Sequence, residues 1–224
     1  MTARALDALY PFLAAAARDA GARPDAPGLL DDAARSTEAK IREIASVRAA
    51  LFQETPALVA CAGAMAVAFE AGGTLLAFGN GGSATDARAV VQLYTTPPRG
   101  RALPAIGLAS DGAVLTALAN DVGFEVVFAR QVAALGRAGD IALGLSTSGD
   151  SPNVLSAFEE ADRRGLLTVG LAGSRGGRMS ESRAIRHLFV VPSPSIHRIQ
   201  EAQTTLYHVL WELVQAVLET RSDP

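Results

Sequence analysis

The pattern of apolar positions predicts alternating strands and helices from about residue 74 onward. Short, nearly continuous apolar runs are typical of strands buried on both faces, and segments with helical periodicity separate them. The predicted strands are Thr74–Phe78, Ala105–Leu108, Ile141–Leu145, Leu167–Leu171 and Leu188–Val191. The predicted helices are Ala84–Tyr94, Ala113–Leu135, Pro152–Arg164 and Ile196–Glu219. This alternation predicts an α/β fold: a five-stranded parallel sheet with helices on both faces.

The pattern before the first strand is helical. Residues 1–22 predict an isolated helix, and the Pro- and Gly-containing stretch Gly21–Gly28 predicts a linker. Helical periodicity returns over Ser36–Thr55. The next segment, Pro56–Glu70, is apolar on almost all sides. A helix of that kind must be buried, either in its own core or against another subunit.

Composition excludes several classes of function. The net charge of −3 implies no general attraction to nucleic acid or to a membrane surface. The single cysteine, Cys61, rules out an intrachain disulfide and a cysteine-based zinc site. The only lysine, Lys40, lies in a predicted exposed helix, so we expect neither a P-loop lysine nor a Schiff base.

Targeting signals are weak in this sequence. The apolar stretch Leu9–Ala17 is similar to the core of a signal peptide, but only Arg4 precedes it as a side-chain cation and Asp7 interrupts the approach. No other apolar run has the length of a membrane span. We therefore expect a cytoplasmic protein.

The first candidate site is the glycine-rich turn after the first predicted strand, Gly79-Asn80-Gly81-Gly82-Ser83. Glycines let a ligand approach the main chain, and the exposed amides of the following helix attract anions. A tight strand–helix turn without any ligand is the alternative.

The second candidate site follows the third predicted strand, in the stretch GLSTSGDSPNV. Ser146, Thr147, Ser148 and Ser151 place four hydroxyl groups within six residues. Ser151 before Pro152 predicts a helix N-cap with proline at the first helical position. Four hydroxyls exceed what one cap needs, so we favour a phosphate site over an ordinary cap.

At this point the chain resembles the sugar isomerase (SIS) family, most closely its sedoheptulose-7-phosphate isomerase, or phosphoheptose isomerase, branch. The resemblance rests on FGNGGSATDA, LTALANDVGFEVVFARQV, GDIALGLSTSGDSPNVLSA and RIQEAQTTLYHVLWELV, and covers about Ser36 to Leu218. It divides the chain into an N-terminal helical extension with linker, residues 1–35, and an SIS domain, residues 36–224.

The resemblance implies a three-layer αβα sandwich and a homotetramer with sites between subunits. It implies that Asn80, Gly81, Gly82 and Ser83 contact a sugar and that Ser146, Thr147, Ser148 and Ser151 hold its phosphate. Asp121 matches an aspartate that lines the site. Asp150 stands where asparagine is common, so its carboxylate either weakens anion binding or points away.

The chain departs from the family at the catalytic residues. The resembled enzymes take a His and a Glu from the helix after the glycine turn, and a Gln and a His from the last helix; zinc-bound members use these as ligands. Gln200 and His208 match, but Ala89 and Leu93 stand at the other two positions. We therefore predict no metal site of the family's kind, and no other cofactor.

The last helix keeps a polar stripe. At about 100° per residue, Gln200, Thr204 and His208 fall within about 80° of one another and of His197. His208 is a candidate catalytic base, with a surface or interface histidine as the alternative. His197 is a further candidate that would replace the missing base. His187 is interpreted as structural, and Arg99 and Arg101 as solvated residues or as the edge of a phosphate site.

Two functions from different classes fit these observations. The first is a sugar-phosphate isomerase acting on a seven-carbon ketose phosphate. The second is a non-catalytic SIS module that senses a sugar phosphate or serves as a tetrameric scaffold for a protein partner, as some close relatives do. A nicotinamide-binding domain fits poorly, because GNGGSA lacks the full GxGxxG spacing and no acidic residue closes a following strand.

Overall fold

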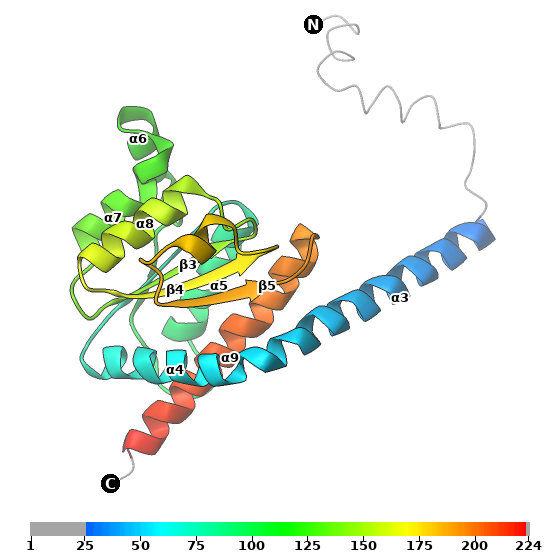
Figure 1. Ribbon diagram of the computed structural model, residues 1–224, viewed down its shortest axis with the longest axis horizontal. Helices are drawn as coiled ribbons and strands as arrows, with labels where there is room; N and C mark the ends of the chain where they lie inside the picture. Colours follow the sequence, from blue (N-terminus) through cyan, green and yellow to red (C-terminus); the bar gives the residue numbers. More distant parts are fainter. Residues whose placement is uncertain (1–25, 223–224) are drawn as a thin grey trace, which may run out of the picture. The chain divides into compact units, whose positions relative to one another are not determined.

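The computed structural model describes residues 26–222 of the chain. The chain divides into two compact units, Met1–Glu43 and Ile44–Pro224. The helix predicted for residues 1–22 lies outside the described residues. Figure 1 gives the order of the elements along the chain.

The first described helix, α3, runs from Ala26 to Ala50. The prediction of a linker up to Gly28 is therefore wrong at its end, because helix α3 already includes Ala26–Gly28. Proline is tolerated in the first turn of a helix, where its missing N–H would be unpaired in any case. Residues 28–43 are exposed along the whole helix, and ion pairs such as Arg42–Glu38 join successive turns.

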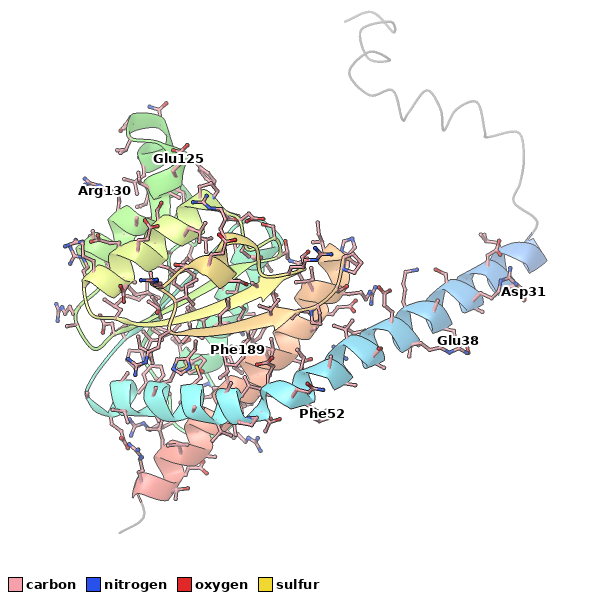
Figure 2. All side chains as sticks on the ribbon, in the orientation of Figure 1. Asp31, Glu38, Phe52, Glu125, Arg130 and Phe189 are labelled. Carbon is pink, nitrogen blue, oxygen red and sulfur yellow. The ribbon has the colours of Figure 1, made fainter. Side chains whose placement is uncertain are left out.

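A short 3₁₀ turn, η1 (Leu51–Glu54), leads into α4 (Thr55–Glu70). By length and composition alone, one described stretch, Gly28–Glu70, is apolar enough to contain a membrane-crossing helix, which the sequence pattern did not predict. The apolar part of that stretch is α4, and seven of its residues are buried in the core of the main unit. Val59 and Val67 of α4 are exposed. Phe52 of η1, labelled in Figure 2, is exposed as well.

The sheet confirms the five predicted strands to within two residues at each end. The strands are β1 (Leu75–Gly79), β2 (Ala105–Gly107), β3 (Ile141–Ser146), β4 (Leu167–Gly173) and β5 (His187–Val191). All are parallel, in the order β2-β1-β3-β4-β5. The carboxyl ends of β1 and β3 are therefore neighbours at one edge, with Gly79 paired to Leu145.

Helices cover both faces of the sheet and complete the predicted three-layer αβα sandwich (Figure 1). One core lies between the sheet and α4, α5 (Gly82–Thr95) and α9 (Ile196–Ser222), and contains Cys61, Phe189 and Trp211. The other lies between the sheet and α7 (Val127–Leu135) and α8 (Pro152–Arg163), around Phe78, Phe128 and Phe158. Burial raises the pKa of the Cys61 thiol to about 12, which makes it an inert core residue.

The helix predicted over Ala113–Leu135 is two helices. Helix α6 (Gly112–Asp121) ends before Gly123, whose φ of 132° no other residue type adopts readily, and a 3₁₀ turn, η2 (Phe124–Val126), precedes α7. The apolar pattern continues through Val122 and Phe124, so the pattern does not predict that the helix ends here. None of the residues of α6 is buried.

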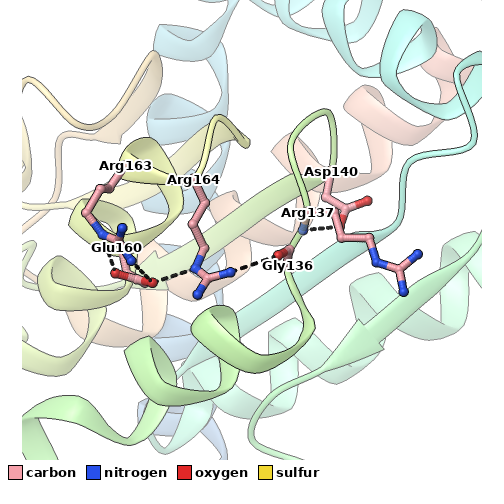
Figure 3. A network of polar contacts seen from close by, with 6 residues as sticks. All are labelled: Gly136, Arg137, Asp140, Glu160, Arg163 and Arg164. Carbon is pink, nitrogen blue, oxygen red and sulfur yellow. Dashed lines mark hydrogen bonds and ion pairs between the residues drawn. The ribbon is translucent and has the colours of Figure 1, made fainter.

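Polar contacts hold the opposite, amino-terminal edge of the sheet (Figure 3). The buried Asp140 carboxylate accepts hydrogen bonds from the backbone N–H of Thr74 (2.7 Å) and of Arg137 (2.8 Å), which ties the start of β1 to the start of β3. Glu160 accepts from both Arg163 and Arg164, and Arg164 also donates to the Gly136 carbonyl. This edge is thus held by the hydrogen bonds of Asp140 and by the contact of Arg164 with the loop before β3.

Candidate functional site

The two predicted turns lie side by side at the carboxyl edge of the sheet, as ligand sites in open parallel sheets do. The Asn80 side chain in the first turn and the Asn153 side chain at the start of α8 exchange two hydrogen bonds, of 2.8 and 2.9 Å. Asn153 is buried, so this amide pair links the turns rigidly. Sequence reasoning missed Asn153, whose role depends on a partner 73 residues away.

The loop after β3 gathers three serine hydroxyls. The Ser146 Oγ lies 3.1 Å from the Ser151 Oγ and 3.4 Å from the Ser148 Oγ, and it accepts a hydrogen bond from the Gly149 N–H. Ser151 occupies the N-cap position of α8 as predicted, but its side chain makes no capping hydrogen bond and faces Ser146 instead. Hydroxyls that converge in front of a helix N-terminus can donate to phosphate oxygens without any lysine.

The glycine turn after β1 exposes main chain to a ligand. Gly81 has a φ of 54° and forms the N-cap of α5. Gly81 and Gly82 are exposed, whereas the Ser83 side chain is buried below them. The predicted sugar-contacting residues Asn80, Gly81 and Gly82 thus form one open turn next to the serine loop.

Gln200 of α9 lies directly against this turn. A Cβ placed on Gly82 would lie 2.0 Å from the Gln200 Nε2, so only glycine leaves room for that amide. The Gln200 side chain also hydrogen-bonds to the carboxylate of Asp86, one turn further along α5. The structure therefore brings the predicted Gln200 to the glycine turn.

Asp86 is a site residue that sequence reasoning missed. Burial raises the pKa of its carboxyl above the ordinary value, an effect that the Gln200 hydrogen bond partly offsets. Its Oδ2 atom is buried and has no hydrogen-bond partner among the described residues. The sequence could have pointed to Asp86, because it lies on the same helical face as positions 89 and 93.

His208 lies on the same stripe of α9 as Gln200, as predicted. Its Nδ1 lies 2.8 Å from the carbonyl oxygen of Thr204, and its ring stacks on Tyr207 with centroids 4.9 Å apart. Because a carbonyl only accepts, Nδ1 carries the hydrogen, and in the neutral ring Nε2 keeps the free lone pair. His208 is exposed, so Nε2 can act as a base toward a ligand.

The family's zinc site does not fit this chain. Ala89 and Leu93 have no donor atoms, and both pack against the core between the sheet and α9. Among the described residues, no group of three or more His, Cys, Asp and Glu side chains could hold a metal ion. Gln200 and His208 remain as two of the four expected ligands, which is too few for a tetrahedral zinc site.

Three further predicted site residues are Asp121, His197 and Thr147. The exposed Asp121, at the end of α6, accepts a hydrogen bond from the neighbouring Asn120 amide. His197 is exposed in the first turn of α9, on the Gln200 side of His208. Thr147 is partly buried in the serine loop. For these residues the predicted roles remain predictions.

The structure also gives the contacts of Asp150, Arg99 and His187. The Asp150 Oδ1 accepts a hydrogen bond from the Arg178 N–H (2.9 Å), so this oxygen is bound by the segment after β4. Arg99 forms an ion pair with Glu212 of α9 at 3.1 Å, and its guanidinium lies over the Trp211 ring. Its charge is therefore already paired with side chains of α9. Burial lowers the pKa of His187, with a smaller contribution from Arg186, and its Nε2 is buried.

Comparisons with known proteins agree with this geometry. The model of the family described as SIS domain matches residues 40–173. A phosphoheptose isomerase of Aquifex aeolicus is 42% identical over 81% of this chain and 95% of its own length. The phosphoheptose isomerase of Pelobacter propionicus is 47% identical over 76% of this chain and 93% of its own.

A solved structure is also similar. The phosphoheptose isomerase from Neisseria gonorrhoeae has a TM-score of 0.74 at 36% identity and covers 84% of this chain and 99% of its own. The residues matched by the family model, 40–173, include both turns of the candidate site. The chain belongs to the SIS domain family, in its phosphoheptose isomerase branch.

Proposed function

We propose that this protein binds a seven-carbon ketose phosphate and isomerises it to the aldose phosphate. The observation that carries the proposal is the pairing of two turns: a serine loop without lysine at Ser146–Ser151, and a glycine turn covered by Gln200. Their amide link, Asn80 to Asn153, holds a phosphate end and a sugar end at a fixed separation.

The chemistry moves a proton between C1 and C2 through an enediol, which needs a base at carbon and hydrogen-bonding groups at the two oxygens. In the proposed reaction the His208 Nε2 removes and returns the carbon proton. The Gln200 amide and the Asp86 carboxyl hold O1 and O2. Ala89 and Leu93 contribute only apolar contact, so we expect slower turnover than four polar groups would give.

The test is a direct assay. Purified protein is incubated with sedoheptulose 7-phosphate, and formation of the aldose phosphate is followed with and without added zinc. We expect turnover in the native chain, a loss of about a hundredfold or more in His208→Ala, and no dependence on zinc. Equal rates in the native chain and in His208→Ala would rule out the isomerase.

A second function has its own supporting observation. Because Ala89 and Leu93 pack against the core, the helix after the glycine turn offers no acid or base at those positions. A sugar-phosphate sensor, or a scaffold for a protein partner, would need the phosphate loops alone. If sedoheptulose 7-phosphate raises the melting temperature but is not converted, the protein is a sensor. If the sugar phosphate neither raises the melting temperature nor is converted, the scaffold function is favoured.

We also propose a cytoplasmic homotetramer. The exposed apolar side chains Phe52, Val59 and Val67 along η1 and α4 support association with further copies, since a helix face of this kind favours burial. Light scattering on the purified chain, with Phe52→Glu as a variant, measures the assembly directly.

A further inference from the structure

A polar cavity lies between helix α5 and the loop that follows β2. Its volume is about 450 Å³, and its lining consists of Ala84, Thr85 and Arg88 of α5 and of Ala109 and Ser110 of the loop. Strand β1 lies between β2 and β3 in the sheet, so this cavity flanks the glycine turn on the side opposite the serine loop. It thus opens at the carboxyl edge of the sheet, where ligands bind in folds of this kind.

The loop after β2 is held in one shape by contacts on both sides. The Leu108 N–H donates to the Ala77 carbonyl of β1 at 2.9 Å, and the Gln131 side chain of α7 donates to the Leu108 carbonyl at 2.9 Å. A Cβ on Gly107 would lie 2.7 Å from the Ser110 Oγ, so glycine at 107 leaves room for that hydroxyl. The loop therefore bends back over the end of β2 and holds Ser110 in the cavity wall.

Three polar side chains of the cavity wall have no partner within the described part of the chain. No hydrogen bond or ion pair between described residues involves the Arg88 guanidinium, the Thr85 hydroxyl or the Ser110 hydroxyl. Thr85 and Arg88 are three positions apart on α5, so they share one face of the helix. Asp86 lies about 160° around the helix from Arg88 and hydrogen-bonds to Gln200 instead. The charge of Arg88 is therefore available to a ligand.

The donors of the cavity wall suit an anion. The acidic residue beside Ser110 is Asp111, whose Oδ1 caps α6 by accepting from the Ala113 and Val114 N–H groups at 2.9 and 3.1 Å. A guanidinium and two hydroxyls are donors that match the oxygens of a phosphate group. The wall thus offers one positive charge, while the oxygen that Asp111 uses is bound to the backbone of α6.

The cavity is too far from the serine loop to share one phosphate with it. Neighbouring strands lie about 4.8 Å apart, so the ends of β2 and β3, with β1 between them, are separated by about 10 Å. Hydrogen bonds to phosphate oxygens extend only about 3 Å. An anion in this cavity is therefore a second one, in addition to any anion at the serine loop.

We propose that this cavity is a second anion site, which binds a phosphate group through Arg88, Thr85 and Ser110. The inference goes beyond the proposed function, because it concerns a different wall of the carboxyl edge and does not depend on isomerisation. Two sources present the same chemistry: the far end of a bisphosphorylated ligand that is also held by the serine loop, and a separate phosphate ion.

Calorimetric titration of the full chain with inorganic phosphate tests the proposal. The variant that combines Ser146→Ala with Ser151→Ala first removes the serine loop as a competing site. We expect this variant to keep one phosphate site. In the same background Arg88→Ala should weaken that site about tenfold or more, because a charge-assisted contact is lost. Arg88→Lys should give an intermediate affinity, because lysine keeps the charge but not the planar fork of donors.

The matched control is Arg130→Ala, which removes the same charge from an exposed position of α7 outside the cavity. We expect it to change the phosphate affinity less than twofold, and the ligand-free melting temperatures to stay equal because both arginines are exposed. Equal affinities in Arg88→Ala and its parent, an equal loss in Arg130→Ala, or no phosphate binding by the serine variant overturns the proposal.

A bisphosphate distinguishes the two sources. Sedoheptulose 1,7-bisphosphate and sedoheptulose 7-phosphate are compared on the native chain and on Arg88→Ala. A bisphosphate that binds at least about tenfold tighter, and loses this advantage in Arg88→Ala, occupies both sites with its two ends. Equal affinities of the two sugars, with inorganic phosphate still dependent on Arg88, assign the site to a separate ion. Absence of turnover would remove the isomerase and leave the second anion site standing.

Discussion

The turn after β1 and the turn after β3 begin alike, at the ends of neighbouring parallel strands, but they continue differently. The loop after β3 is polar throughout and leads into α8, whose first turn carries the buried Asn153. The turn after β1 leads into α5, where Asp86 is followed on the same face by Ala89 and Leu93. The loop after β3 offers hydroxyl and amide groups, while the turn after β1 leads into a helix with apolar side chains at positions 89 and 93.

The difference implies that binding and turnover would be separable under the proposed function. In that proposal the phosphate is held by hydroxyls, amides and glycines of one loop, whereas proton transfer uses side chains of two helices in contact, α5 and α9. Changes on α5 can therefore alter the chemistry while the phosphate loop remains intact.

The largest effect is expected at Gly149. Its φ is 74° and a Cβ would lie 1.9 Å from a backbone oxygen, so Gly149→Ala must displace the loop. We expect a loss of about 3 kcal/mol or more in the free energy of unfolding. The matched variant is Gly81→Ala in the other turn, with a φ of 54° but no atom within 4 Å, which should lose only the backbone strain of about 1–2 kcal/mol. Urea unfolding measures both; equal losses would mean that the two turns are equally tight.

The next effect is at the link between the turns. Asn153→Ala removes both hydrogen bonds to Asn80 and leaves a half-buried amide without its partner. We expect a loss of about 2 kcal/mol in stability. In a double-mutant cycle, Asn80→Ala should add little to Asn153→Ala. Additive losses would show that the amides do not couple the turns.

A smaller effect on stability, but a clear one on turnover, is expected at Gly82. Gly82→Ala places a methyl group where the Gln200 amide lies, and that flexible side chain can move away. The melting temperature should change by less than about 4 °C. Turnover should fall about tenfold or more as Gln200 leaves the turn, while the affinity for inorganic phosphate stays the same. A matching loss of phosphate affinity would contradict the separation of the two turns.

The smallest effect concerns pH. Burial raises the pKa of Asp86 in the folded state, so folding binds a proton more tightly there, and stability falls as pH rises through that raised pKa. In Asp86→Asn this pH-dependent loss of stability is absent, because the amide does not ionise. Its melting temperature should match that of the native chain at acidic pH and exceed it increasingly from about pH 4 upward. A constant difference across the pH range would show that Asp86 ionises as it does in the unfolded chain.

Much of the fold could be predicted because it depends on local patterns. The buried strands read as apolar runs, and the parallel order follows from their alternation with helices. The break at Gly123 could not be predicted, since Val122 and Phe124 are apolar but exposed. The helix start at Ala26 was missed because Pro27 was taken for a linker residue rather than a first-turn proline.

The residues of the candidate site also fall into those that the sequence predicts and those that it does not. The serine loop and the glycine turn are contiguous in sequence, so their residues could be named in advance. Asp86 and Asn153 could not, because each depends on a partner from a distant segment: Gln200 for Asp86 and Asn80 for Asn153. Spacing along one helix predicts a face but not what packs against it.

The central claim is that the loop after β3 holds the phosphate of a sugar ligand. The most direct measurement is the dissociation constant of sedoheptulose 7-phosphate, by calorimetry, for the native chain and for Ser146→Ala combined with Ser151→Ala. We expect saturable binding to the native chain and an affinity at least about tenfold lower in the double variant, because two hydroxyl donors to a phosphate are removed. Equal affinities in a folded double variant would contradict it.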